Sequence, residues 1–142
     1  MNTLEQAELL EAVHHHQNPD RFTSSEHAIY IVTDDGLKTM DTGTDVYDII
    51  ENPTNQQLAR DLGCSVAITT QGWASPRNTE TDDDVAPSQH PQRRRVALFV
   101  MVTKSGKMAS VLRFSDKPNE TVTDDGEARG TLAEALLEMV TA

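Results

Sequence analysis

The chain has little of the chemistry that cross-links a small protein. Its 142 residues include a single cysteine, Cys64, so an internal disulfide is excluded. Cys64 lies among apolar neighbours, and we expect it to pack as a small buried hydrophobe. A chain of this length buries roughly 68–70% of its unfolded surface, which supports a core without disulfides or metals. We therefore expect a single domain that spans residues 1–142.

Cationic residues are also few. Twelve Lys and Arg residues stand against 23 Asp and Glu residues, which gives a net charge of −11 at pH 7. Nucleic acids and anionic membranes bind clustered cations, so this balance argues against both as partners. It favours solubility or a basic protein partner.

Long apolar runs are missing as well. No segment approaches the ~20 apolar residues of a membrane span. The first residues are acidic and helical in pattern, without the basic and apolar regions of a secretory signal. We therefore expect a cytoplasmic protein that does not bind a membrane.

The clearest structural signal is a hairpin over residues 96–114. Residues 96–102 are apolar at every position, residues 103–107 form a turn pattern, and residues 108–114 return as a second strand. A strand that is apolar on both faces requires cover on both faces. We therefore expect a layered core that includes Ile31, Leu98, Phe99, Val100, Met101, Leu136 and Met139.

The rest of the chain alternates between helical and extended patterns. Capping-box patterns begin at Thr3, Thr54 and Thr131. An Asp-Asp-Gly sequence at 34–36 predicts a type I′ hairpin turn. The expected elements are a helix to about residue 15, strands at 28–32 and 37–40, a broken helix over 44–62, a strand at 65–73, an acidic proline-bearing loop at 76–92, the central hairpin, turns and loop over 117–126, and a final helix from 131.

This order predicts an α+β fold. Short hairpin connections make the sheet largely antiparallel, with about five strands covered by helices in the order α-ββ-α-βββ-α. The element order resembles that of profilin-like and roadblock/longin domains. That resemblance covers nearly the whole chain and implies a fold, but fold alone does not imply function.

A second resemblance rests on short runs of residues. The runs at 71–76 and 90–96, with the ending at 112–114, look like small acidic proteins of actinobacterial type. The resemblance implies no activity and no catalytic residue.

The three consecutive histidines at 14–16 are the most obvious metal-binding candidate. Successive residues of a helix point about 100° apart, so these three cannot converge on one ion. Glu11 and His15 are four residues apart and form one two-ligand pair, whereas zinc requires four ligands, or three with a water. His27 and His90 would join only if the fold brings them in. We predict solvated histidines, no metal and no cofactor.

Signatures of catalysis are incomplete. Ser88 and His90 lie close in sequence to aspartates, and Cys64 offers a thiol, but neither set has the motif of a known nucleophile. Phosphate-binding glycine loops are absent. The Asp-Asp-Gly sequences at 34–36 and 124–126 lack the spacing of a calcium loop.

The best candidate for a binding surface surrounds the only tryptophan. Trp73 is expected at a strand end, where it serves either the core or an interface. His90, Arg93 and Arg95 are expected at the same end of the sheet. The acidic run at 82–84 and the basic run at 93–95 bracket one loop, where they either neutralise each other or contact a partner.

Three functions from different classes remain open. The favoured one is a small cytosolic binding or regulatory module that contacts a protein partner, or a second copy of itself, through a sheet face or edge. The alternative is a metal-dependent or Cys/His nucleophilic enzyme. The third is an acidic decoy that occupies a basic surface.

Overall fold

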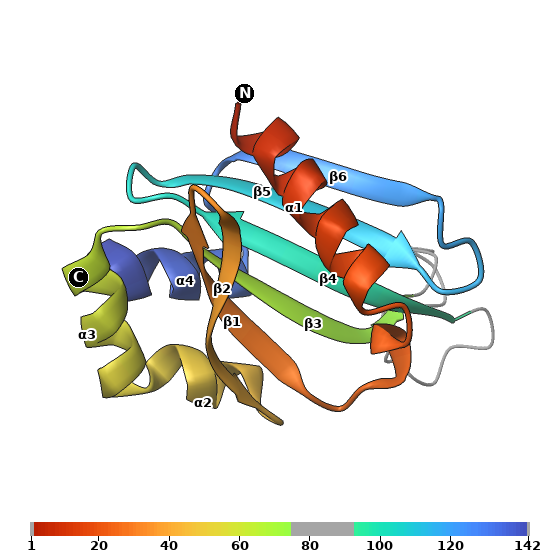
Figure 1. The fold of residues 1–142 in the computed structure, drawn as a ribbon, viewed down its shortest axis with the longest axis horizontal. Coiled ribbons are helices and arrows are strands. Elements are labelled where there is room, and N and C mark those ends of the chain that lie inside the picture. Colours follow the sequence, from red (N-terminus) through yellow and green to blue (C-terminus); the bar gives the residue numbers. More distant parts are fainter. Residues whose placement is uncertain (1, 75–92, 142) are drawn as a thin grey trace, which may run out of the picture.

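The computed structural model describes residues 2–74 and 93–141, so the acidic loop expected at 76–92 lies outside the described residues (Figure 1). The described part is an α+β domain. Its elements are α1 (Thr3–Gln17), the 3₁₀ turn η1 (Arg21–Thr23), β1 (His27–Thr33), β2 (Gly36–Gly43), α2 (Val46–Glu51), α3 (Pro53–Leu62), β3 (Val66–Ala74), β4 (Arg94–Val102), β5 (Lys107–Phe114), β6 (Thr121–Glu127) and α4 (Thr131–Thr141).

The strands form one antiparallel sheet with the order β2-β1-β3-β4-β5-β6. The predicted hairpin supplies the central strand β4 and its neighbour β5: β4 pairs with β5 from Val96↔Phe114 to Val102↔Met108, and with β3 along its whole length. Over residues 96–102 of β4, side chains on both faces are buried, as predicted, except that Leu98 is only half-buried. Leu98 lies on the α4 face but packs only at the margin of the core there.

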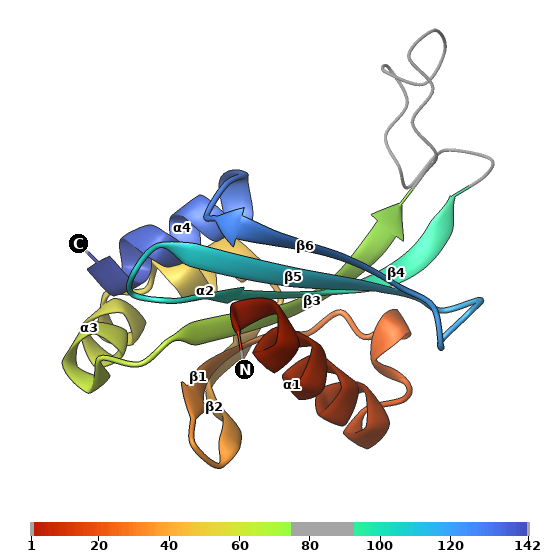
Figure 2. The ribbon, with the colours of Figure 1, turned by 90° about the horizontal axis from the view of Figure 1, so that it is seen from above.

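Helices cover the two faces unequally. Helix α1 lies on one face, and α2, α3 and α4 gather on the other (Figures 1 and 2). The core under α2–α4 is built around Ile29, Ile49, Ile50, Val66, Ile68, Val100, Val102, Leu136 and Met139. The smaller core under α1 contains Ala7, Val32, Ala67, Phe99, Met101, Ala109 and Val111. Within the described ranges, no helix has the length and apolar character needed to cross a membrane.

A sixth strand, β6, stands where the sequence predicts turns and loop. All seven of its residues are exposed, so it buries no side-chain face and shows no apolar alternation. Its ladder with β5, from Lys107↔Glu127 to Arg113↔Thr121, is what makes it a strand. The carboxylates of Asp124 and Asp125 fit an exposed edge, because charges discourage a further strand from pairing there.

Local signals at turns and caps lie close to their expected positions. The side chains that cap α1 and α3 belong to Asn2 and Asn52, one and two residues before the expected Thr3 and Thr54, and Asp45 caps α2. The β1–β2 turn consists of residues 34 and 35, and Gly36, at φ 118°, is the residue with positive φ. A type I′ turn would need positive φ at both central residues, so that prediction was wrong.

We predict that the α1-face core depends on Phe99. Phe99→Ala should lower the free energy of unfolding by about 3–5 kcal/mol, because it opens a cavity at a fully buried position. Leu98→Ala, next along the same strand but half-buried, is the matched control and should cost less. Chemical denaturation measures both, and an equal loss for the two variants would contradict the difference in burial between Phe99 and Leu98.

Candidate binding groove

The structure brings three of the four predicted surface residues together at one end of the sheet. Trp73 on β3 pairs across the ladder with Arg95 on β4. The guanidinium of Arg95 lies 4.3 Å from the centre of the indole ring, and that of Arg93 lies 4.9 Å from it. His90, the fourth residue, lies outside the described residues.

This cluster also has a structural role. Trp73 is half-buried, and Arg95 donates a hydrogen bond of 3.0 Å from Nη1 to the carbonyl oxygen of Phe22 in η1. Gln71, two residues before Trp73, donates to the carbonyl oxygens of Ser24 and Glu26 at 2.7 and 2.6 Å. The cluster therefore fixes the connection from η1 into β1 against the sheet. A role for Trp73, Arg93 and Arg95 in binding stays a prediction.

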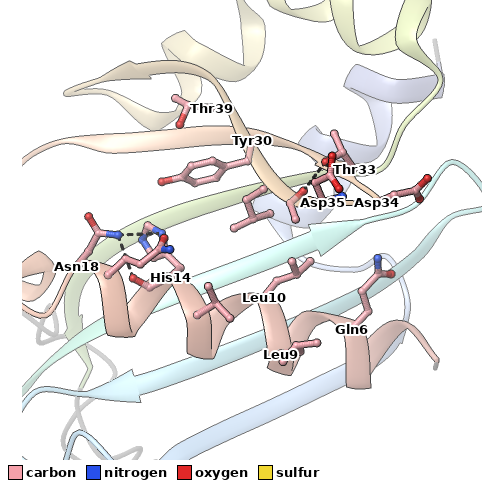
Figure 3. A pocket seen from close by; sticks show the side chains of 14 residues that line it. Gln6, Leu9, Leu10, His14, Asn18, Tyr30, Thr33, Asp34, Asp35 and Thr39 are labelled. Carbon is pink, nitrogen blue, oxygen red and sulfur yellow. Dashed lines mark hydrogen bonds between the residues drawn. The ribbon is translucent and has the colours of Figure 1, made fainter.

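A cavity forms a groove between α1 and the β1–β2 hairpin. The hairpin curls toward the face on which α1 lies (Figure 2). The space between them has a volume of about 650 Å³, within the range of ligand sites. Figure 3 shows Leu9, Leu10 and His14 on one side and Tyr30 with the hairpin turn on the other.

A second cavity of about 400 Å³ continues the groove toward η1. The two cavities share four lining residues, which are His14, Gln17, Asn18 and Tyr30. From Gln6 to Asn18, the residue that ends α1, the groove follows the helix for twelve residue steps, or about 18 Å. Its far wall is the connection into β1 that Gln71 and Arg95 hold in place.

Exposed apolar side chains line the α1 side of the groove. Leu9 is 53% exposed and Val13 is 48% exposed, although both are large apolar residues. The face of α1 that packs on the sheet passes instead through Ala7 and Glu11, both buried. The helix therefore presents apolar groups to two places, the sheet and the groove.

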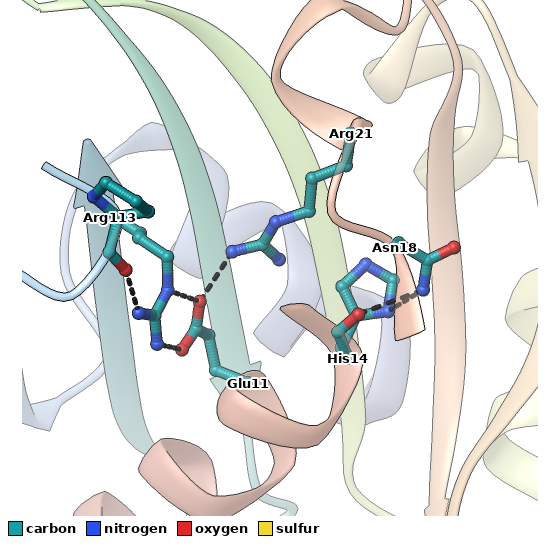
Figure 4. A network of polar contacts seen from close by, with 6 residues as sticks. Glu11, His14, Asn18, Arg21 and Arg113 are labelled. Carbon is teal, nitrogen blue, oxygen red and sulfur yellow. Dashed lines mark hydrogen bonds and ion pairs between the residues drawn. The ribbon is translucent and has the colours of Figure 1, made fainter. Parts of the chain in front are cut away.

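A buried ion cluster fixes α1 in this position (Figure 4). Glu11 is only 1% exposed, and its carboxylate accepts two hydrogen bonds from Arg113 on β5, at 2.8 Å from Nε and 2.5 Å from Nη2. Arg21 of η1 donates a third, at 2.5 Å from Nη2. Burial by itself would raise the pKa of Glu11, but the hydrogen bonds from Arg113 and Arg21 outweigh it and hold that pKa below its usual value.

The cluster contains one more cation than anion. Arg113 also donates a hydrogen bond to the carbonyl oxygen of Pro118, so each of its three guanidinium nitrogens has a partner. Arg21 is 8% exposed, and its Nε and Nη1 atoms are buried without a hydrogen-bond partner among the described residues. Arg21 lines the second cavity, and Figure 4 shows the unpaired end of its guanidinium on the side of His14.

His14 lies at the junction of the two cavities. Its ring meets that of Tyr30 edge-on at 5.5 Å, and its Nδ1 lies 3.4 Å from the Asn18 side-chain nitrogen, which also donates to the carbonyl oxygen of His14. Burial, and then the positive charge of Arg21, lower the pKa of His14 to about 4. The expectation of solvated histidines therefore fits exposed His16 but not half-buried His14 and His15.

The candidate metal pair is engaged in other contacts. Both carboxylate oxygens of Glu11 accept hydrogen bonds from arginines, and His15 packs edge-on against Phe22 at 5.9 Å. In the described part of the chain, no three His, Cys, Asp or Glu residues gather closely enough to hold a metal ion.

No family model, curated protein or solved structure matches this chain.

We predict that Glu11→Gln destabilises the protein by about 3–5 kcal/mol near pH 7, because it leaves two buried guanidinium groups without a counter-charge. The folded-state pKa of Glu11 is lowered, so its stabilisation is complete above its ordinary value of 4.5 and is lost as the pH falls below it. Parent and variant should therefore converge in acid. Denaturation at several pH values measures the free energy of unfolding of both proteins, with exposed Glu8→Gln as the matched control. If the parent protein and Glu11→Gln kept the same difference in stability at every pH, the prediction would be contradicted.

We also predict a contribution from His14 at higher pH. Between the ordinary value of 6.5 and the folded-state value of about 4, the unfolded chain binds a proton at His14 that the folded protein does not. Stability should therefore fall as the pH drops from 7 to 5, and less steeply in His14→Gln. His16→Gln controls for the loss of one histidine from the same helix. If the stability of His14→Gln fell with pH as steeply as that of the parent protein, the argument that burial lowers the pKa of His14 would be refuted.

Proposed function

We propose that this protein is a small binding module that acts through contact with a protein partner, and that the partner places an extended segment in the groove between α1 and the β1–β2 hairpin. The observation that carries the proposal is the exposure of Leu9 and Val13 inside a concave surface. Large apolar groups gain roughly 25 cal/mol for each Å² removed from water, so a ligand that covers them is stabilised.

The dimensions of the groove favour a short peptide segment. An extended chain rises about 3.3 Å per residue, so about 18 Å accommodates five or six residues. Alternate side chains of such a segment point the same way, and those facing α1 would lie over Leu9 and Val13. Polar groups of Gln6, Gln17 and Asn18 line the same space and can bind the main chain.

Charge defines the partner further. Asp34 and Asp35 line the hairpin end of the groove, and Asp20 and Glu26 line the η1 end. The whole chain carries a net charge of −11. A segment that is apolar in the middle and basic at its ends complements this pattern, and long-range attraction would speed its association.

A second copy of the chain is a poorer complement than a basic partner. Pairing two β6 edges would bring Asp124, Asp125 and Glu127 of each copy together, and only part of that charge is offset by ion pairs with Arg129 and Lys107. Like charges across an interface are costly. We therefore favour a different protein over the homodimer that the sequence also allows.

The test is calorimetric titration of a seven-residue peptide with lysine at both ends, alternating leucine and serine between them, and a free carboxyl terminus. Leu9→Arg should weaken binding by about tenfold or more, because it fills the groove and repels the lysines. Leu62→Arg is the matched control, because Leu62 is 49% exposed on α3, away from the groove. Equal affinities for the two variants, or no binding to the parent, would contradict the proposal.

A further inference from the structure

We infer that the η1 end of the groove captures the last residue of the bound segment, and that this residue is basic: Arg21 binds its terminal carboxylate while Asp20 and Glu26 bind its side chain. The inference rests on the proposed function and specifies the partner as a chain with a C-terminal lysine or arginine. It follows from three features of the second cavity.

The first feature is the unused capacity of Arg21. The side chain is more than nine-tenths buried, one nitrogen is bound to Glu11, and Nε and Nη1 have no partner among the described residues. The cluster of Glu11, Arg21 and Arg113 holds two guanidinium groups and one carboxylate. A second carboxylate would balance the charge, and a guanidinium binds a carboxylate strongly because both are planar and charged.

The second feature is that the connection from η1 into β1 borders the groove at this end. The connection from η1 into β1 forms the wall, and Gln71 and Arg95 hold it to the sheet through the carbonyl oxygens of Ser24, Glu26 and Phe22. Ser24 and Glu26 line the cavity themselves. A segment that ran past this point would meet the wall, whereas a chain terminus ends at it. The carboxylate is therefore that of the C-terminus and not of an internal Asp or Glu.

The third feature is the presence of Asp20 and Glu26 around the same cavity. Both are exposed, and they would repel an anion that carried no other charge. A C-terminal lysine or arginine complements both kinds of charge. Its terminal carboxylate would bind the buried Arg21, and its cationic side chain would bind the exposed carboxylates of Asp20 and Glu26. This combination excludes phosphate and simple carboxylic acids as the favoured ligands.

The experiment compares four probes by calorimetry: the lysine-ended peptide used above, the same peptide as its C-terminal amide, the same peptide ending in norleucine, and free Nα-acetyl-lysine. We expect the amide to bind about tenfold more weakly, because it loses the charge-assisted contact. The norleucine peptide should be about threefold to tenfold weaker on the parent protein. That difference should vanish on the double variant Asp20→Asn/Glu26→Gln.

The matched control is Asp34→Asn/Asp35→Asn, which removes the same charge from the opposite end of the groove. It should weaken all three peptides but keep the difference between lysine and norleucine. Equal affinities of acid and amide would overturn the role of Arg21 and leave the groove proposal standing. No binding by any peptide would overturn both. If free Nα-acetyl-lysine bound as tightly as the peptide, the proposal that a segment occupies the groove would be refuted, because the rest of the peptide would then contribute nothing to the affinity.

Discussion

The position of α1 depends on the ion cluster of Glu11, Arg21 and Arg113. It joins the middle of the first helix to η1 and to β5, a strand 102 residues away in sequence. Buried ion pairs gain little over a well-packed apolar contact, but breaking one is costly, so they fix a single arrangement more than they add stability. Here they hold α1 over β4 and β5 and leave the curled β1–β2 hairpin uncovered beside it.

The groove is a consequence of that placement. Because Glu11 faces the sheet, Ala7 and Leu10 pack beside it, and Leu9 and Val13 are turned toward the hairpin. If α1 instead turned Val13 toward the sheet, the charged side chain of Glu11 would lie outside the core. The same geometry puts the extra cation, Arg21, at the η1 end of the groove and His14 at its middle. The residues that stabilise the position of α1 are therefore also the ones that shape the proposed binding groove.

The sequence predicted the elements whose side chains repeat in a simple pattern. The central hairpin, the α+β class and the final helix follow from apolar runs at strand or helix spacing. β6 could not be predicted, because an exposed edge strand forms only main-chain contacts with its neighbour. The groove could not be predicted either: a charged residue such as Glu11 on a helix indicates a surface position, and Arg21 follows a helix-ending Asn-Pro-Asp sequence at residues 18–20. Only the partners that these residues meet across the fold reveal their burial.

The central claim is that the groove is the binding site, and amide chemical-shift mapping of the isotope-labelled protein tests it most directly. On titration with the lysine-ended peptide, the account predicts that the largest shifts fall on residues 6–18 of α1 and its C-terminal end, on Tyr30 and on the hairpin turn at 33–37. Shifts confined to the Trp73 and Arg95 end of the sheet, or to the β6 edge, would contradict the account and identify a different contact surface.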